Sequence, residues 1–162
     1  MEEVLALRGK LFGTACSFRC TITADYGQML ETFTLDCESP ATGALDFTVV
    51  GPEGISGITG MVDADRGYLT FDDQVLAVAL LDDGTLSPLC APWVLLQALR
   101  QGCITSVART QDGVQLCVDA SYGEDAIALE IWLDSQGLPK SAQLSKDGRR
   151  MVSMELESVC YA

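Results

Sequence analysis

Ser87 to Gly102, SPLCAPWVLLQALRQG, is the stretch that decides the fold, because it is the one long segment of the chain with helical character. Ser87 can cap the start of a helix, and Pro88 suits the first helical position, where a missing N–H costs nothing. Gly102 suits a left-handed residue that ends a helix. Pro92 would cost a hydrogen bond at the fifth helical position, so a start near Ala91 is the alternative.

The predicted helix, about 88–101, is apolar over most of its circumference. Its strongly polar side chains lie three and four residues apart, so Gln97, Arg100 and Gln101 share one narrow stripe. The remaining apolar surface is wider than a flat sheet could cover. We therefore expect a strongly curved sheet that wraps around this helix.

The rest of the chain reads mainly as short strands between tight turns. Ile127 to Leu133 is the clearest strand, because large apolar residues occupy every second position. Asp112-Gly113 between two alternating runs predicts a hairpin. The run Val75–Leu81 is apolar throughout, which favours a strand buried on both faces beneath the helix. Residues 2–11 predict a short helix with one apolar stripe.

These patterns predict a mainly β protein of the α+β class. We expect about ten strands in a strongly curved antiparallel sheet, an open half-barrel, with the central helix in its concavity and a short amino-terminal helix. Pairing between sequence neighbours would give a meander, which has no βαβ crevice for a nucleotide. With 162 residues and 48% apolar composition, residues 1–162 fit a single domain.

The chain is strongly acidic, since 10 basic and 23 acidic residues give a formal net charge of −13. This charge opposes binding to nucleic acid and to anionic membrane surfaces. No apolar run approaches the roughly 20 residues needed to span a bilayer. The start, MEEVLALRGK, lacks the basic residues and cleavage site of a signal peptide, although a leader removed upstream of Met1 stays open. We predict no nucleic-acid partner.

The seven cysteines are interpreted mostly as small buried hydrophobic residues. No pair has C-x-x-C spacing and the chain has no histidine, so we predict no metal site. Disulfides stay open for some of them. Cys16 and Cys20 lie roughly 13 Å apart along one strand and cannot pair with each other.

The sequence carries little that resembles catalytic chemistry, and we predict neither an enzyme nor a cofactor. Proton transfer near neutral pH most often uses histidine, which is absent. Gly54-Ile55-Ser56-Gly57 misses the spacing of a nucleophile elbow. Asp63-Ala64-Asp65-Arg66-Gly67 resembles the start of a calcium loop but lacks the remaining ligands, and is interpreted as a turn between strands.

Hydrophobic surface is what remains as a candidate site. Large apolar side chains predicted to face the concavity would either pack as a dry core or bind a hydrophobic ligand, because a strip that the helix leaves uncovered needs a ligand or partner. Trp132 alternates onto the outer face, where an exposed tryptophan often marks a partner surface. The cavity candidates are Phe18, Phe33, Phe47, Val49, Trp93, Leu96, Leu129 and Ile131.

The order of these elements resembles the LolA/LppX-like lipoprotein-carrier family over residues 12–159. Four features carry the resemblance: a G-x-L-x-F-x-V-x-x-P-like strand, an aromatic hairpin with an aspartate turn, a Ser-Pro helix start, and a closing L-D-x-x-G-L-P run. In this chain they are Gly43, Leu45, Phe47, Val49 and Pro52; Tyr68–Val75; Ser87 and Pro88; and Leu133, Asp134, Gly137, Leu138 and Pro139.

The resemblance implies non-enzymatic binding, either of an acyl chain or lipidated protein inside the half-barrel, or of a protein partner. The second alternative is an interaction or scaffolding lipoprotein of the cell envelope or spore, with a filled core and a partner protein or a homodimer. Family members with these sequence features resemble lipoproteins of Gram-positive, sporulating bacteria. The family pattern implies an extracytoplasmic position, with a lipid anchor on an amino-terminal cysteine upstream of Met1.

Overall fold

A computed structural model describes residues 2–11, 13–25, 27, 30–63, 66–71, 74–79, 81–82, 85–121 and 126–161. Two α-helices and two short 3-10 turns accompany the strands: α1 (Glu2–Leu11), η1 (Glu53–Ile55), η2 (Pro88–Cys90) and α2 (Ala91–Gln101). The strands are β1 (Cys16–Asp25), β2 (Leu30–Ser39), β3 (Leu45–Gly51), β4 (Thr59–Asp63), β5 (Arg66–Phe71), β6 (Gln74–Ala79), β7 (Leu81–Asp82), β8 (Thr85–Leu86), β9 (Cys103–Thr110), β10 (Gly113–Asp119), β11 (Ile127–Leu133), β12 (Pro139–Lys146) and β13 (Arg149–Tyr161).

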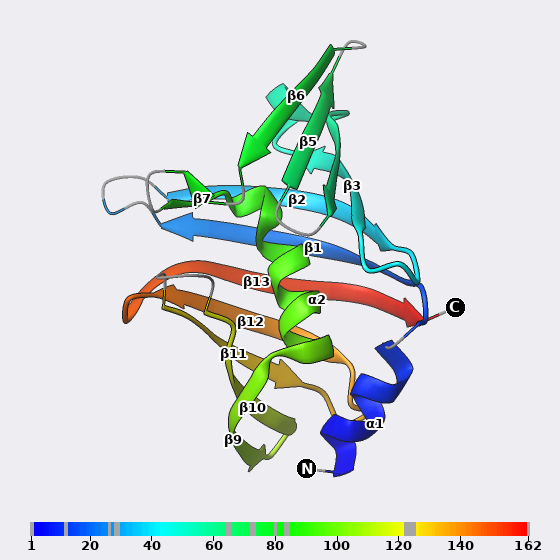
Figure 1. The fold of residues 1–162 in the computed structure, drawn as a ribbon, viewed down its shortest axis with the longest axis vertical. Helices are drawn as coiled ribbons and strands as arrows, with labels where there is room; N and C mark the ends of the chain where they lie inside the picture. Colours follow the sequence, from blue (N-terminus) through cyan, green and yellow to red (C-terminus); the bar gives the residue numbers. More distant parts are fainter. Residues whose placement is uncertain are drawn as a thin grey trace.

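Within the described residues, eleven strands form one antiparallel sheet in the order β6-β5-β4-β3-β2-β1-β13-β12-β11-β10-β9, and β7 pairs with β8. The predicted mainly β fold with two helices is confirmed. The sheet is two meanders joined where β1 pairs with β13. It curves strongly around α2 without closing into a barrel (Figure 1). We call the face toward α2 the inner face and the opposite one the outer face.

The central helix lies in the concavity, as predicted, and crosses in front of the strands (Figure 1). It begins as the 3-10 turn η2 and continues as α2, which places Pro92 in the first α-helical turn, where backbone N–H groups have no helical partner. The predicted side-chain cap is wrong: Ser87 makes no such bond, and its carbonyl accepts the Cys90 N–H at 3.0 Å.

The predicted left-handed end of the helix is also wrong, because Gly102 is extended, with φ −64° and ψ 155°. Close packing explains the glycine instead. A Cβ at Gly102 would lie 2.4 Å from Val118 Cγ1 and 2.7 Å from the Ala98 carbonyl oxygen. The chain can turn from α2 into β9 against the neighbouring strand only where no side chain intervenes.

The apolar run Val75–Leu81 does not lie beneath the helix. Its first part forms β6, the edge strand of the sheet, and the Val75 side chain is 67% exposed. The prediction failed because a short apolar run has the same appearance whether it is central or at an edge, and only strand pairing distinguishes them. Leu80 lies outside the described residues.

The remaining strand and helix predictions agree with the structure. β9 and β10 form the hairpin around Gln111-Asp112, and β11 buries its apolar positions. In α1, Val4, Leu7 and Leu11 are buried against the core. Asp63 and Arg66 pair at the ends of β4 and β5, which confirms a turn between strands there; Ala64 and Asp65 lie outside the described residues.

Gly60 gives the ring of Phe47 its space on the inner face. The two residues are paired across β3 and β4, and a Cβ at Gly60 would lie 2.2 Å from Phe47 Cζ. Because the ring is buried on the inner face, it has little room to move aside. We expect Gly60→Ala to lower the free energy of unfolding by about 1–3 kcal/mol, the usual cost of overpacking.

Urea denaturation followed by circular dichroism would measure this loss. Gly54→Ala is the matched control, because nothing lies within 4 Å of its added Cβ and its backbone needs no left-handed conformation. Equal stability of the two variants would contradict the packing that we describe for Phe47.

Candidate functional site

Helix α2 fills the concavity with apolar side chains. Its buried residues are Ala91, Pro92, Trp93, Val94, Leu95, Leu96, Ala98 and Leu99. Each large side chain of this kind contributes roughly 1.5–3 kcal/mol when fully buried. The helix is therefore part of the protein core as well as the plug of the half-barrel.

The polar stripe of α2 is bound to the rim of the half-barrel. Trp93 Nε1 and Gln97 Nε2 both donate to the Gly43 carbonyl, at 3.2 and 3.0 Å. Gly43 lies in the loop between β2 and β3, so this loop holds the outward side of the helix. The stripe that sequence analysis identified as polar thus carries hydrogen bonds that position α2.

Two arginines tie the helices to each other at their carboxyl ends. Arg8 of α1 donates to the carbonyls of Leu99, at 2.9 Å, and of Gly102 at the end of α2. Arg100 of α2 donates to the Leu11 carbonyl, at 3.3 Å, at the end of α1. Each cation thus meets carbonyl groups that have no helical partner, at the negative end of the other helix.

We expect Arg8→Ala to lower the free energy of unfolding by about 1.5–3 kcal/mol, because hydrogen bonds from a charged group are among the stronger ones. Thermal and urea unfolding would measure the loss. Lys10→Ala is the control: it removes the same charge from the same helix, and Lys10 is exposed. A loss of similar size in both variants would mean that charge, and not the contact with α2, is responsible.

All eight predicted cavity residues lie in the concavity between the sheet and α2. Seven are buried members of one hydrophobic cluster, and Phe33 is half-buried and packs against it. The strand members face α2, and Trp93 and Leu96 belong to α2 itself. These side chains thus lie in the concavity as predicted, around a helix that occupies most of the space between them, and their role in ligand binding stays a prediction.

An opening of about 310 Å³ leads from the surface into the gap between α2 and the ends of β9, β10 and β11. Of the predicted residues, only Trp93 lines it. The other lining residues were not predicted from the sequence, because they come from α2, β9, β10, β11 and the loops beside them, which meet only in the folded chain. A usable signal existed on α2, where Trp93, Val94, Gln97, Ala98 and Gln101 form one stripe. The remaining lining residues are Gly102, Cys103, Asp119, Ala120, Ser121 and Ile127.

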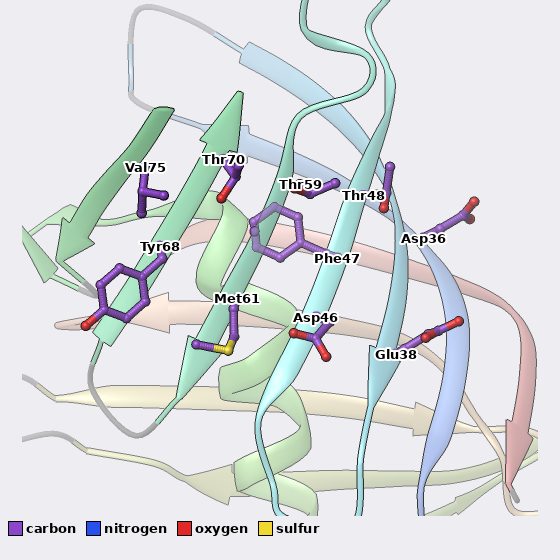
Figure 2. Close-up of a pocket in the computed structure, with 11 residues that line it drawn as sticks. Asp36, Glu38, Asp46, Phe47, Thr48, Thr59, Met61, Tyr68, Thr70 and Val75 are labelled. Carbon is purple, nitrogen blue, oxygen red and sulfur yellow. The ribbon is translucent and has the colours of Figure 1, made fainter. Parts of the chain in front are cut away.

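A larger hollow of about 580 Å³ lies on the outer face over β2 to β6 (Figure 2). Carboxylates line one end of it, threonines the middle, and Met61, Tyr68 and Val75 the other end. Phe47 also lines it, beside Gly60.

Trp132 lies elsewhere, half-buried on the outer side of β11 between Gln115 and Ser141. Its outward direction agrees with the alternation of the sequence, because its neighbours Ile131 and Leu133 are buried. Its role as a partner surface stays a prediction.

The buried cysteines behave as small apolar residues with unreactive thiols. Burial raises the pKa of Cys20 to about 12 and that of Cys90 to about 11. Burial also raises the pKa of Cys37, helped by the neighbouring Cys20, and that of Cys16, although Arg100 opposes the shift there. These thiols are protonated at neutral pH and are poor nucleophiles.

The other three cysteines provide a solution test of the strand assignment. Cys103 and Cys160 are exposed and Cys117 is half-buried. We expect iodoacetamide at pH 8 to modify Cys103 and Cys160 first and Cys117 more slowly, as measured by peptide mass spectrometry. The four buried thiols should react only in guanidinium chloride. Fast labelling of Cys20 or Cys37 in the native chain would contradict the described inner face.

Neither a metal-ligand cluster nor a membrane-spanning helix is found among the described residues. Among these residues, no group of three or more Cys, Asp or Glu side chains is arranged to hold a metal ion. Neither described helix combines the length and the apolar surface that crossing a bilayer would require.

Solved structures share this architecture along almost the whole chain. An uncharacterized conserved protein from Thermus thermophilus has a TM-score of 0.55 at 10% identity, covering 99% of this chain and 86% of its own. A DUF1329 family protein from Desulfovibrio piger has a TM-score of 0.52 at 8% identity, covering 99% and 90%. A domain of a proposed outer membrane lipoprotein-sorting protein from Vibrio parahaemolyticus has a TM-score of 0.50 at 8% identity, covering 98% and 91%.

No protein-family model matches the sequence, and no curated protein matches it. The structural likeness therefore concerns the fold alone, and it agrees with the fold that the resemblance of the sequence implies.

Proposed function

We propose that this chain is a non-enzymatic binding domain that holds a hydrophobic ligand, an acyl chain or the lipid of a lipidated protein, between α2 and the inner face of the sheet. The observation that carries the proposal is the opening beside Trp93, which is lined by apolar Val94, Ala98 and Ile127 as well as by polar side chains and lies next to the hydrophobic core. Its volume of about 310 Å³ is at the lower end for ligand sites, which span roughly 300–1,000 Å³.

Ligand entry would therefore move α2 outward and use the wall behind it. In this proposal Phe18, Phe33, Phe47, Val49, Leu96, Leu129 and Ile131 are the residues that a displaced helix uncovers. The hydrogen bonds that hold α2 lie on its outward side and at its carboxyl end; most of them reach a loop or α1, and one joins Arg100 to Ser39 at the end of β2. The domain would act outside the membrane, with a lipid anchor upstream of Met1.

Ala120 offers the sharpest test, because it lines the opening and is only half-buried. We expect Ala120→Phe to weaken binding of a fluorescent fatty acid at least tenfold by filling the opening, as measured by fluorescence titration. Ala128→Phe is the matched control, since Ala128 is exposed on the outer side of the neighbouring β11. It should bind like the parent chain.

Native mass spectrometry and lipid extraction after bacterial expression complete the test. A bound lipid, or a lipid-dependent rise in melting temperature, supports the proposal. A clean apo mass without such a rise would overturn it and favour the alternative, a protein-interaction domain of the envelope with a filled core.

A further inference from the structure

The hollow on the outer face has an ordered lining, set by strand register. Two rows of side chains run across the strands: Asp36, Thr48, Thr59, Thr70 and Val75 form one row, and Glu38, Asp46, Met61 and Tyr68 form the other. The first row changes from acidic at β2 through threonines to Val75 at β6, and the second changes from acidic at β2 and β3 to apolar at β4 and β5 (Figure 2). We call the surface formed by these nine residues the outer groove.

The acidic end of the outer groove carries a negative charge that the described chain does not balance. Asp36 is neutralised by Arg19, whose guanidinium donates to both carboxylate oxygens at 2.7 and 3.0 Å. Glu38 and Asp46 face each other across β2 and β3, and in the described part of the chain neither has an ion-pair or hydrogen-bond partner. Like charges in directly opposite positions destabilise a sheet.

These two carboxylates also line a second hollow of about 330 Å³, next to Tyr161 and Cys160. They therefore lie at the junction of two depressions, where a partner can approach from either side. A positive group at this point would relieve the repulsion between Glu38 and Asp46 and would be attracted by the net charge of −13.

The opposite end of the outer groove exposes apolar surface. Val75 is 67% exposed and Met61 is 39% exposed, and Tyr68 lies half-buried beside Met61. β6 is the edge strand here, and its sequence QVLAVA has no charge, proline or register shift of the kind that usually protects an edge. A partner that covers this end would bury apolar area that the described chain leaves in water.

We propose that the outer groove binds an extended segment of a partner protein that carries basic residues, followed by apolar residues. Strands lie about 4.8 Å apart, so the distance from β3 to β6 is about 14 Å, or about four residues of extended chain at 3.3 Å each. The recognised pattern is thus a Lys or Arg with a large apolar residue four positions later. This surface lies on the face of the sheet away from α2 and shares no residue with the ligand opening.

A pair of fluorescein-labelled peptides tests the spacing. Lys-Arg-Ser-Thr-Ser-Leu-Val places arginine and leucine four positions apart, and Lys-Arg-Leu-Val-Ser-Thr-Ser has the same composition with the spacing collapsed. Fluorescence anisotropy at low salt should show at least fivefold tighter binding of the first peptide. Equal affinities for the two peptides would overturn the proposal. So would the absence of binding by either peptide.

Variants locate the binding on the outer groove. We expect Glu38→Gln with Asp46→Asn to weaken binding at least tenfold, whereas Glu130→Gln with Glu155→Gln, at exposed sites on β11 and β13, should change it less than twofold. Val75→Thr should weaken binding at least threefold, and Val50→Thr, at an exposed position outside the groove, should not.

If the groove variants and the control variants lose the same peptide affinity, only the net charge attracts the peptide. That result would overturn the proposal. All four positions with acidic groups are exposed, so circular dichroism should show unchanged folding in each variant. The fatty-acid titration run on the same variants keeps the two proposals separate, because we expect lipid binding to be unaffected.

Discussion

The path of the chain between the two sheet edges is the constraint on which the rest of the structure depends. The first meander ends at the edge strand β6 and the second begins at the opposite edge strand β9. The chain must therefore cross the whole sheet between them, and it does so over the inner face as α2 (Figure 1). A segment that crosses a concave apolar face must itself be apolar on nearly all sides, because strands surround it.

This arrangement separates the polar and apolar contacts of α2. Apolar side chains hold the helix against the curved wall without directional bonds, while hydrogen bonds from Arg8, Arg100, Trp93 and Gln97 hold its carboxyl end and its outward side. The outer face differs, since its threonines, carboxylates and exposed apolar groups are in register across five strands.

How far the site could be predicted depends on how local its determinants are. The residues that face the concavity follow from alternation within one strand or the stripe of one helix, and Phe18, Phe47 and Ile131 were found in this way. The opening beside Trp93 was missed, because Cys103, Ala120 and Ile127 belong to different segments and meet α2 only in the folded chain. The outer groove needs the register of five strands, which alternation within each strand does not specify.

The sequence by itself determined the helix, nearly all of the strands and the direction of their side chains, because caps, turns and hydrophobic period act over a few residues. The tertiary structure decided that β6 lies at an edge, that Gly102 serves close packing, and that the polar stripe of α2 binds the rim of the half-barrel. These outcomes depend on which segments become neighbours. Strand pairing and helix docking select those neighbours through the burial and shape of the whole sheet, which no local window of sequence contains.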